Sequence, residues 1–94
     1  MKKVFTIVIL MASVSTVSAF SDIELRGKWS DQIMAVKNGA CKDQTDVVRK
    51  KLLYAASLIM HGEYVEARES IKIADEAVAS KVCKDAVAKI YKPQ

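Results

Sequence analysis

Two cysteines, Cys41 and Cys83, stand at equal distances from Gly62, one 21 residues before it and the other 21 residues after it. Glycine is typical of the position just past a helix end, where the chain turns back. Because antiparallel helices rise equally, by about 1.5 Å per residue, arms of equal length bring their far ends level. The spacing therefore predicts a helical hairpin that turns at Gly62 and is closed at its open end by a disulfide.

The start of the chain has the layout of a secretory signal peptide. A basic beginning precedes an apolar run, and Val17 and Ala19 occupy the −3 and −1 positions of a cut after Ala19. The apolar run is too short to cross a bilayer, which takes about 20 residues. We expect a Sec-type signal peptide over residues 1–19 and a single helical domain over residues 20–94. This mature chain, periplasmic or secreted, is expected to have no transmembrane segment.

Export determines how the cysteine pair is interpreted. Secreted chains meet an oxidising compartment, so Cys41 and Cys83 are expected to form a disulfide. A mature chain this short has a small core, and closing a loop of about 42 residues contributes about 4 kcal/mol in the chain-entropy model. The alternatives are a redox site or a metal pair, but the C-x-x-C spacing is missing and the only histidine, His61, falls at the far end of the predicted hairpin.

Net charge argues against nucleic acid as a partner. Without Lys2 and Lys3 of the signal peptide, thirteen Lys and Arg face eleven Asp and Glu, which gives a net charge of +2. Nucleic-acid-binding domains are strongly basic along one face. The basic run of the mature chain is Arg49, Lys50 and Lys51, which is either a solvated helix face or a docking patch for an acidic partner.

Apolar residues recur every three or four positions, which is typical of amphipathic helices. The sequence predicts an all-α fold: a small antiparallel bundle of three to four helices, built on a central hairpin and closed by one disulfide. Ser80 can cap a last helix after a bend; a single straight helix from Tyr64 to Tyr91 is the alternative. The expected helices cover residues 22–37, about 45–61, 64 to about 79, and about 81–91.

Each predicted helix has an apolar face that we expect in the core. The second helix is apolar on most sides and is therefore expected to be central, touching both of its sequence neighbours. Methionines are expected to fill gaps in this core. The predicted core positions are Trp29, Ile33, Met34 and Val36; Val48, Leu52, Leu53, Ala55, Ile59 and Met60; Tyr64, Ala67, Ile71, Ala74 and Val78; and Val82, Ala86 and Ile90.

Within residues 53–79, Ala55, Gly62, Tyr64, Ala67, Ile71 and Ala74 stand at characteristic spacings. On these residues the segment resembles a single tetratricopeptide-repeat helix pair. The positions that carry the resemblance are those of the turn glycine, the aromatic residue, and the small and large apolar residues of that repeat. Lys51, Tyr54 and Ala79 depart from its pattern. One repeat implies a packing geometry for two helices, whereas a peptide groove takes about three.

The sequence offers no set of catalytic residues. His61 falls at a helix end, where histidine is typically a favourable cap. Ser57 precedes it by four residues, but no carboxylate is spaced to complete a triad. Glu63 and Glu66 flank the turn and with His61 would make only a weak metal cluster. We therefore expect no enzymatic activity, no cofactor and no metal site.

Several apolar residues fall off the predicted core faces and indicate an exposed patch. These are Leu25, Val47, Val65, Ile73 and Val87. Together with the basic run, they suggest partner contacts. The candidate partner-binding residues are Arg49, Lys50, Lys51, Val65 and Ile73.

These features favour a non-enzymatic periplasmic accessory factor that binds a protein partner in the cell envelope. Such a factor would be pilotin-like, an assembly adaptor or a toxin-neutralising partner. The alternative is a small periplasmic chaperone of the acid-stress type, which would expose apolar surface when its carboxylates are protonated. Self-association into a homodimer stays open, since a domain of this size gains core by pairing.

Overall fold

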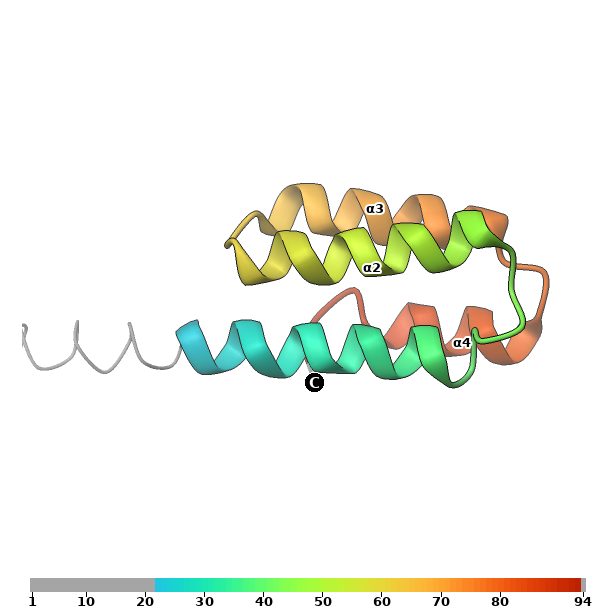
Figure 1. The fold of residues 1–94 in the computed structure, drawn as a ribbon, viewed down its shortest axis with the longest axis horizontal. Coiled ribbons are helices and arrows are strands. Elements are labelled where there is room, and N and C mark those ends of the chain that lie inside the picture. Colours follow the sequence, from blue (N-terminus) through green and yellow to red (C-terminus); the bar gives the residue numbers. More distant parts are fainter. Residues whose placement is uncertain (1–21, 94) are drawn as a thin grey trace, which may run out of the picture.

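The computed structural model describes residues 22–93, and the predicted signal peptide with its cut after Ala19 lies outside them. The described chain is all-helical, which confirms the predicted fold class (Figure 1). The expected alternative of one straight helix through residue 80 is wrong, because the chain leaves the helix at residues 78–80. The helices cover residues 22–38, α2 Asp46–Met60, α3 Tyr64–Ala77 and α4 Lys81–Lys89.

The helices form two layers (Figure 1). α2 and α3 are the central hairpin, with arms of 15 and 14 residues. The 22–38 helix and α4 lie side by side in the other layer, and consecutive helices run antiparallel. A four-helix arrangement gives each helix a side that packs inward and a side that faces solvent.

The hairpin turns at Gly62, as predicted. Gly62 has a φ of 77°, in the left-handed region that glycine adopts without steric cost. Its N–H donates to the Ile59 carbonyl at 3.0 Å, and the N–H of Glu63 donates to the Leu58 carbonyl at 2.9 Å. This pair of bonds is the Schellman motif, which satisfies the last carbonyls of α2 and reverses the chain.

Two polar residues mark the starts of α2 and α4. Thr45 occupies the N-cap of α2 in extended conformation, although its side chain makes no capping hydrogen bond. Ser80 is the N-cap of α4, and its hydroxyl accepts a 3.1 Å hydrogen bond from the N–H of Cys83, as predicted. The cap starts a new helix after the bend at residues 78–80, and α4 therefore runs back along the 22–38 helix.

The predicted apolar faces of the first three helices form most of the core. Trp29 is 2% exposed, and Ile33, Leu52 and Ile71 are fully buried. Tyr64 packs against this core while partly exposed. The other predicted positions that are buried or packed on the core are Met34, Val36, Val48, Ala55, Ile59, Ala67, Ala74, Val78 and Ile90.

Four predictions about burial were wrong. Leu53 and Met60 are 48% and 52% exposed, because α2 packs inward on one broad side and leaves the other to solvent. On α4, Val82 is 68% exposed whereas Val87, predicted to lie in the exposed patch, is fully buried. The phase of α4 follows Cys83, whose side chain must point inward to reach its disulfide partner. Val87 lies one turn beyond Cys83 on the same face.

A polar cluster joins the 22–38 helix to the start of α3. The Tyr64 hydroxyl donates to Asp22 at 2.9 Å and accepts from Nε of Arg26 at 2.9 Å. Arg26 and Asp22 also form an ion pair of 2.8 Å. The hydrogen bond with Tyr64 raises the pKa of Arg26, and the charge of Asp22 acts in the same direction. The Tyr64 ring stacks on Trp29 with centroids 5.8 Å apart.

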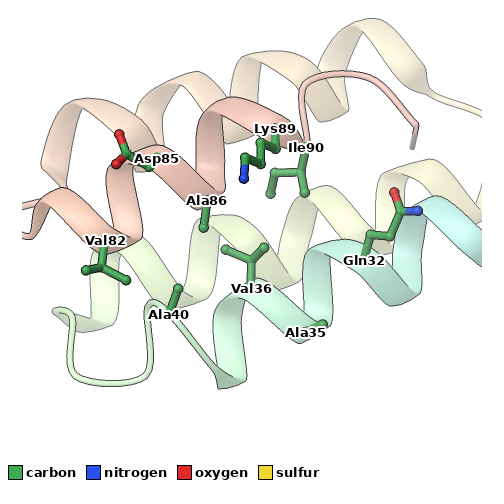
Figure 2. A pocket seen from close by; sticks show the side chains of 9 residues that line it. All are labelled: Gln32, Ala35, Val36, Ala40, Val82, Asp85, Ala86, Lys89 and Ile90. Carbon is green, nitrogen blue, oxygen red and sulfur yellow. The ribbon is translucent and has the colours of Figure 1, made fainter.

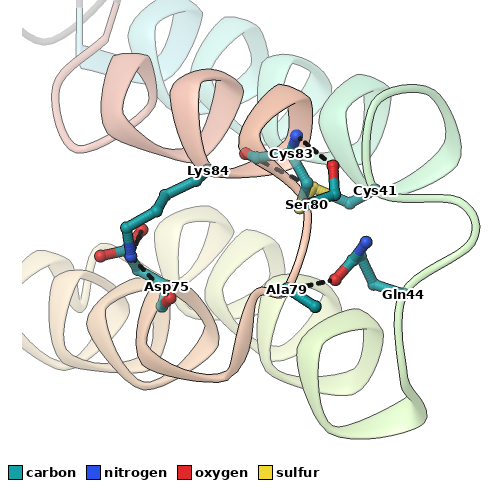
Figure 3. Close-up of a disulfide and its surroundings, with 7 residues drawn as sticks. All are labelled: Cys41, Gln44, Asp75, Ala79, Ser80, Cys83 and Lys84. Carbon is teal, nitrogen blue, oxygen red and sulfur yellow. Dashed lines mark hydrogen bonds and ion pairs between the residues drawn. A yellow bond between two sulfur atoms is a disulfide. The ribbon is translucent and has the colours of Figure 1, made fainter.

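The disulfide joins the two segments that leave the hairpin (Figure 3). Cys41 lies in the turn after the 22–38 helix and Cys83 in the first turn of α4, with their Cα atoms 4.8 Å apart. The open end of the hairpin itself is linked by the N–H of Ala79, which donates to Oε1 of Gln44 at 3.0 Å. The bridge therefore closes the end opposite Gly62, but it does so through the second layer.

Candidate functional site

A groove of about 480 Å³ lies between the 22–38 helix and α4 (Figure 2). One wall comes from the end of the 22–38 helix and the turn that follows, and the other from α4. A volume of this size is in the range of binding sites for small molecules or for a few side chains of a partner. The residues that line it are Gln32, Ala35, Val36, Ala40, Val82, Asp85, Ala86, Lys89 and Ile90.

The groove is mainly apolar. Val36 from one wall points toward Ala86 from the other (Figure 2). Ile90 is 2% exposed and belongs to the core, whereas Val82 is 68% exposed at the end of the groove. The small side chain of Ala35 keeps the groove open on the first wall. Such a surface can bury apolar side chains that approach from solvent.

The disulfide fixes one end of this groove. Ala40 and Val82 line it, and each is the sequence neighbour of a bridged cysteine, Cys41 or Cys83. Both cysteines are fully buried. The covalent link therefore sets the separation of the two walls at this end, so that little conformational entropy is lost there when a ligand binds.

Polar groups stand at the sides of the groove. Gln32 comes from the first wall, and Asp85 and Lys89 come from α4, one turn apart (Figure 2). Polar groups in such positions can fix the orientation of a bound ligand. Within residues 22–93, no three His, Cys, Asp or Glu side chains lie close enough together to hold a metal ion. The arrangement suits binding.

The predicted partner-binding residues do not form one site. Lys51 and Ile73 line a hollow of about 220 Å³ between α2 and α3. Val65 is 73% exposed and lines a different hollow, of about 280 Å³, with Tyr91. Arg49 is half-buried, and its Nε is buried without a hydrogen-bond partner among the described residues. Lys50 is exposed beside it. Their role in partner binding stays a prediction.

The predicted exposed patch is scattered. Leu25, Val47 and Ile73 are 38%, 53% and 44% exposed, but they come from three different helices. His61 is exposed at the end of α2, and its Nδ1 lies 2.8 Å from the Ser57 carbonyl oxygen. That contact ties the imidazole to its own helix end.

The groove residues were not identified from the sequence. Ala35 and Ala40 carry no signal of their own, because alanine has no functional group and is favourable in any helix, whatever that helix contacts. The helical periodicity of the sequence predicts Val82 and Ala86 in the core. A usable signal was the position of Ala40 and Val82 next to the paired cysteines, which brings them together whenever the disulfide forms.

No family model, no curated protein and no solved structure matches the chain. Among the described residues, no helix is long and apolar enough to cross a membrane.

Proposed function

We propose that the chain is a non-enzymatic accessory factor of the cell envelope, which holds an apolar segment of a protein partner in the groove between the 22–38 helix and α4. The observation that carries the proposal is the groove itself, whose two walls are joined by the Cys41–Cys83 disulfide. The signal peptide predicted over residues 1–19 supports a place in the periplasm, where such a bridge persists.

The apolar character of the groove supports a protein segment as its occupant. Val82, largely exposed in the free chain, would be covered by a partner side chain. Burial of apolar surface contributes about 25 cal/mol per Å². The polar side chains of Asp85 and Lys89 at the side of the groove would set the register of the bound segment.

Site-specific crosslinking in the organism that makes the chain tests this function. A photoreactive amino acid in place of Val82 is expected to capture one or a few envelope proteins. Substitution of Ala35, which is exposed and lines the groove, by arginine is expected to abolish the capture by filling the groove. The matched control is Ala88→Arg on α4, which is also exposed but does not line the groove and should leave capture intact.

The proposal is wrong if no protein is captured. It is also wrong if the Ala35→Arg and Ala88→Arg variants capture equal amounts of the crosslinked protein. A broad set of unrelated captured proteins would instead favour the chaperone alternative. Circular dichroism of both arginine variants checks that each retains the helical fold.

A further inference from the structure

A second hollow, of about 220 Å³, lies between α2 and α3 and shares no residue with the groove. Tyr54 and Ile73 supply its apolar surface and are 54% and 44% exposed. Ser70 is buried, and its hydroxyl donates a 2.7 Å hydrogen bond to the Lys51 carbonyl, which holds the two helices together there. The hollow is therefore a fixed feature of the hairpin.

The charges around this hollow have opposite sign on its two walls. Lys51 stands on the α2 wall, and Glu66 and Glu69 stand on the α3 wall. No ion pair forms between these three side chains in the described structure. The hairpin thus presents one positive and one negative wall around two exposed apolar side chains.

We propose that this hollow is a self-association surface that pairs with the same surface of a second copy of the chain. In a two-fold symmetric contact, each patch meets itself. If the two-fold axis runs along the hairpin, α2 of one copy lies over α3 of the other. Such an axis keeps each residue at its own height along the hairpin. Lys51, which is level with Ser70 in its own copy, then lies beside Glu69 of the second copy, and Tyr54 and Ile73 lie on either side of this charge contact.

Charge complementarity favours an axis along the hairpin over the alternative, a two-fold axis that runs across it. An axis across the hairpin would place α2 over α2, so that the positive walls of the two copies face each other. With the axis along the hairpin, every charge contact joins opposite signs and occurs twice. Such complementarity fixes register and suppresses wrong pairings. The exposed side chains of Tyr54 and Ile73 would be covered in the contact and would supply the apolar burial.

The contact also gives Lys51 and Ile73 a physical role, independent of the proposed use of the groove. Val47, an exposed apolar residue of α2, lies one turn before Lys51. Because the two surfaces are separate, a dimer would leave both grooves accessible and would bind two partner segments.

Sedimentation equilibrium of the purified mature protein tests the proposal. Over about a hundredfold range of concentration, a monomer–dimer equilibrium is expected. Lys51→Glu and Glu69→Lys should each weaken association at least about tenfold, because each places like charges together twice. The double variant K51E/E69K should recover most of the lost affinity.

Two variants serve as controls. Lys50→Glu and Glu76→Lys change charges that are exposed on the same helices but do not line the hollow, and they should leave association unchanged. The proposal is overturned if the protein is monomeric throughout, if K51E associates as K50E does, or if the double variant is weaker than either single one. Melting curves verify that every variant is folded.

Discussion

The indole Nε1 of Trp29 donates a hydrogen bond of 2.8 Å to the carbonyl oxygen of Ile90, although 61 residues separate them in the chain. The guanidinium of Arg68 lies over the Trp29 ring, 5.5 Å from its centroid, and Nε of Arg68 donates to the Tyr91 carbonyl at 3.1 Å. These contacts hold the end of α4 against the first and third helices. Because Ile90 lines the groove, these contacts also fix that part of the groove.

Trp29→Phe is expected to lower the free energy of unfolding by about 1–3 kcal/mol, because the Ile90 carbonyl loses its buried donor while an aromatic ring is retained. Urea denaturation followed by far-ultraviolet circular dichroism measures the change. Trp29→Ala, which also leaves a cavity, should lower the free energy of unfolding further than Trp29→Phe does. Equal stability of Trp29→Phe and the wild type would show that the hydrogen bond does not anchor α4.

The double variant C41S/C83S is expected to lose about 2–5 kcal/mol of stability, since it frees a loop of 42 residues and loosens the groove wall. Urea midpoints of the variant and of the wild type, with and without reductant, provide the comparison. Reduced wild-type protein should behave as the variant does. A variant as stable as the oxidised protein would contradict the structural role of the bridge.

Two glycine substitutions should have opposite effects. Gly62→Ala forces a side chain into the left-handed region at a φ of 77°, and we expect it to destabilise the fold by about 1–2 kcal/mol. Gly27 lies within the 22–38 helix with nothing within 4 Å of an added Cβ, so Gly27→Ala should stabilise it by about 0.5–1 kcal/mol. Thermal melting distinguishes them. A Gly62→Ala variant as stable as the wild type would contradict the left-handed turn geometry.

Tyr91 links stability to alkaline pH. Burial, and after it the charges of Asp75 and Glu76, raise the pKa of Tyr91 above its ordinary value of about 10. The folded state thus binds the phenolic proton more tightly than the unfolded chain does. This stabilisation is present below the ordinary pKa and is lost as pH rises through the raised value.

Tyr91→Phe should therefore reduce the loss of stability between about pH 9 and pH 12. This window runs from about one unit below the ordinary tyrosine pKa to about two units above it. Urea midpoints at several pH values measure it, and lysine deprotonation contributes equally to both proteins. An identical alkaline fall in the variant and the wild type would count against the shift.

The sequence was sufficient for the hairpin and for much of the core. Ala67, Ile71 and Ala74 repeat at helical spacing, and they are buried because a helix face of that period can pack only on one side. Gly62 and Ser80 act through local backbone chemistry, which requires no knowledge of distant residues. These features could be predicted since each is determined within a few residues along the chain.

The rotation of α4 about its own axis and the position of the groove could not be predicted from local sequence. Periodicity allowed either Val82 or Val87 on the inner face, and the structure buries Val87. The decision depends on Cys83, whose bond to Cys41 turns that side of α4 inward. The groove then depends on the distance between the 22–38 helix and α4, which are far apart in sequence. The alanines that line it do not reveal that distance in the sequence.

The covalent link between Cys41 and Cys83 joins the two walls of the groove. The most direct measurement is mass spectrometry of the native protein, alkylated at once on cell lysis and digested without reductant. We predict that peptides containing Cys41 and Cys83 are recovered as one cross-linked species, without alkylation at either position. Recovery of both cysteines as alkylated free thiols would contradict the bridge and the fixed groove that it closes.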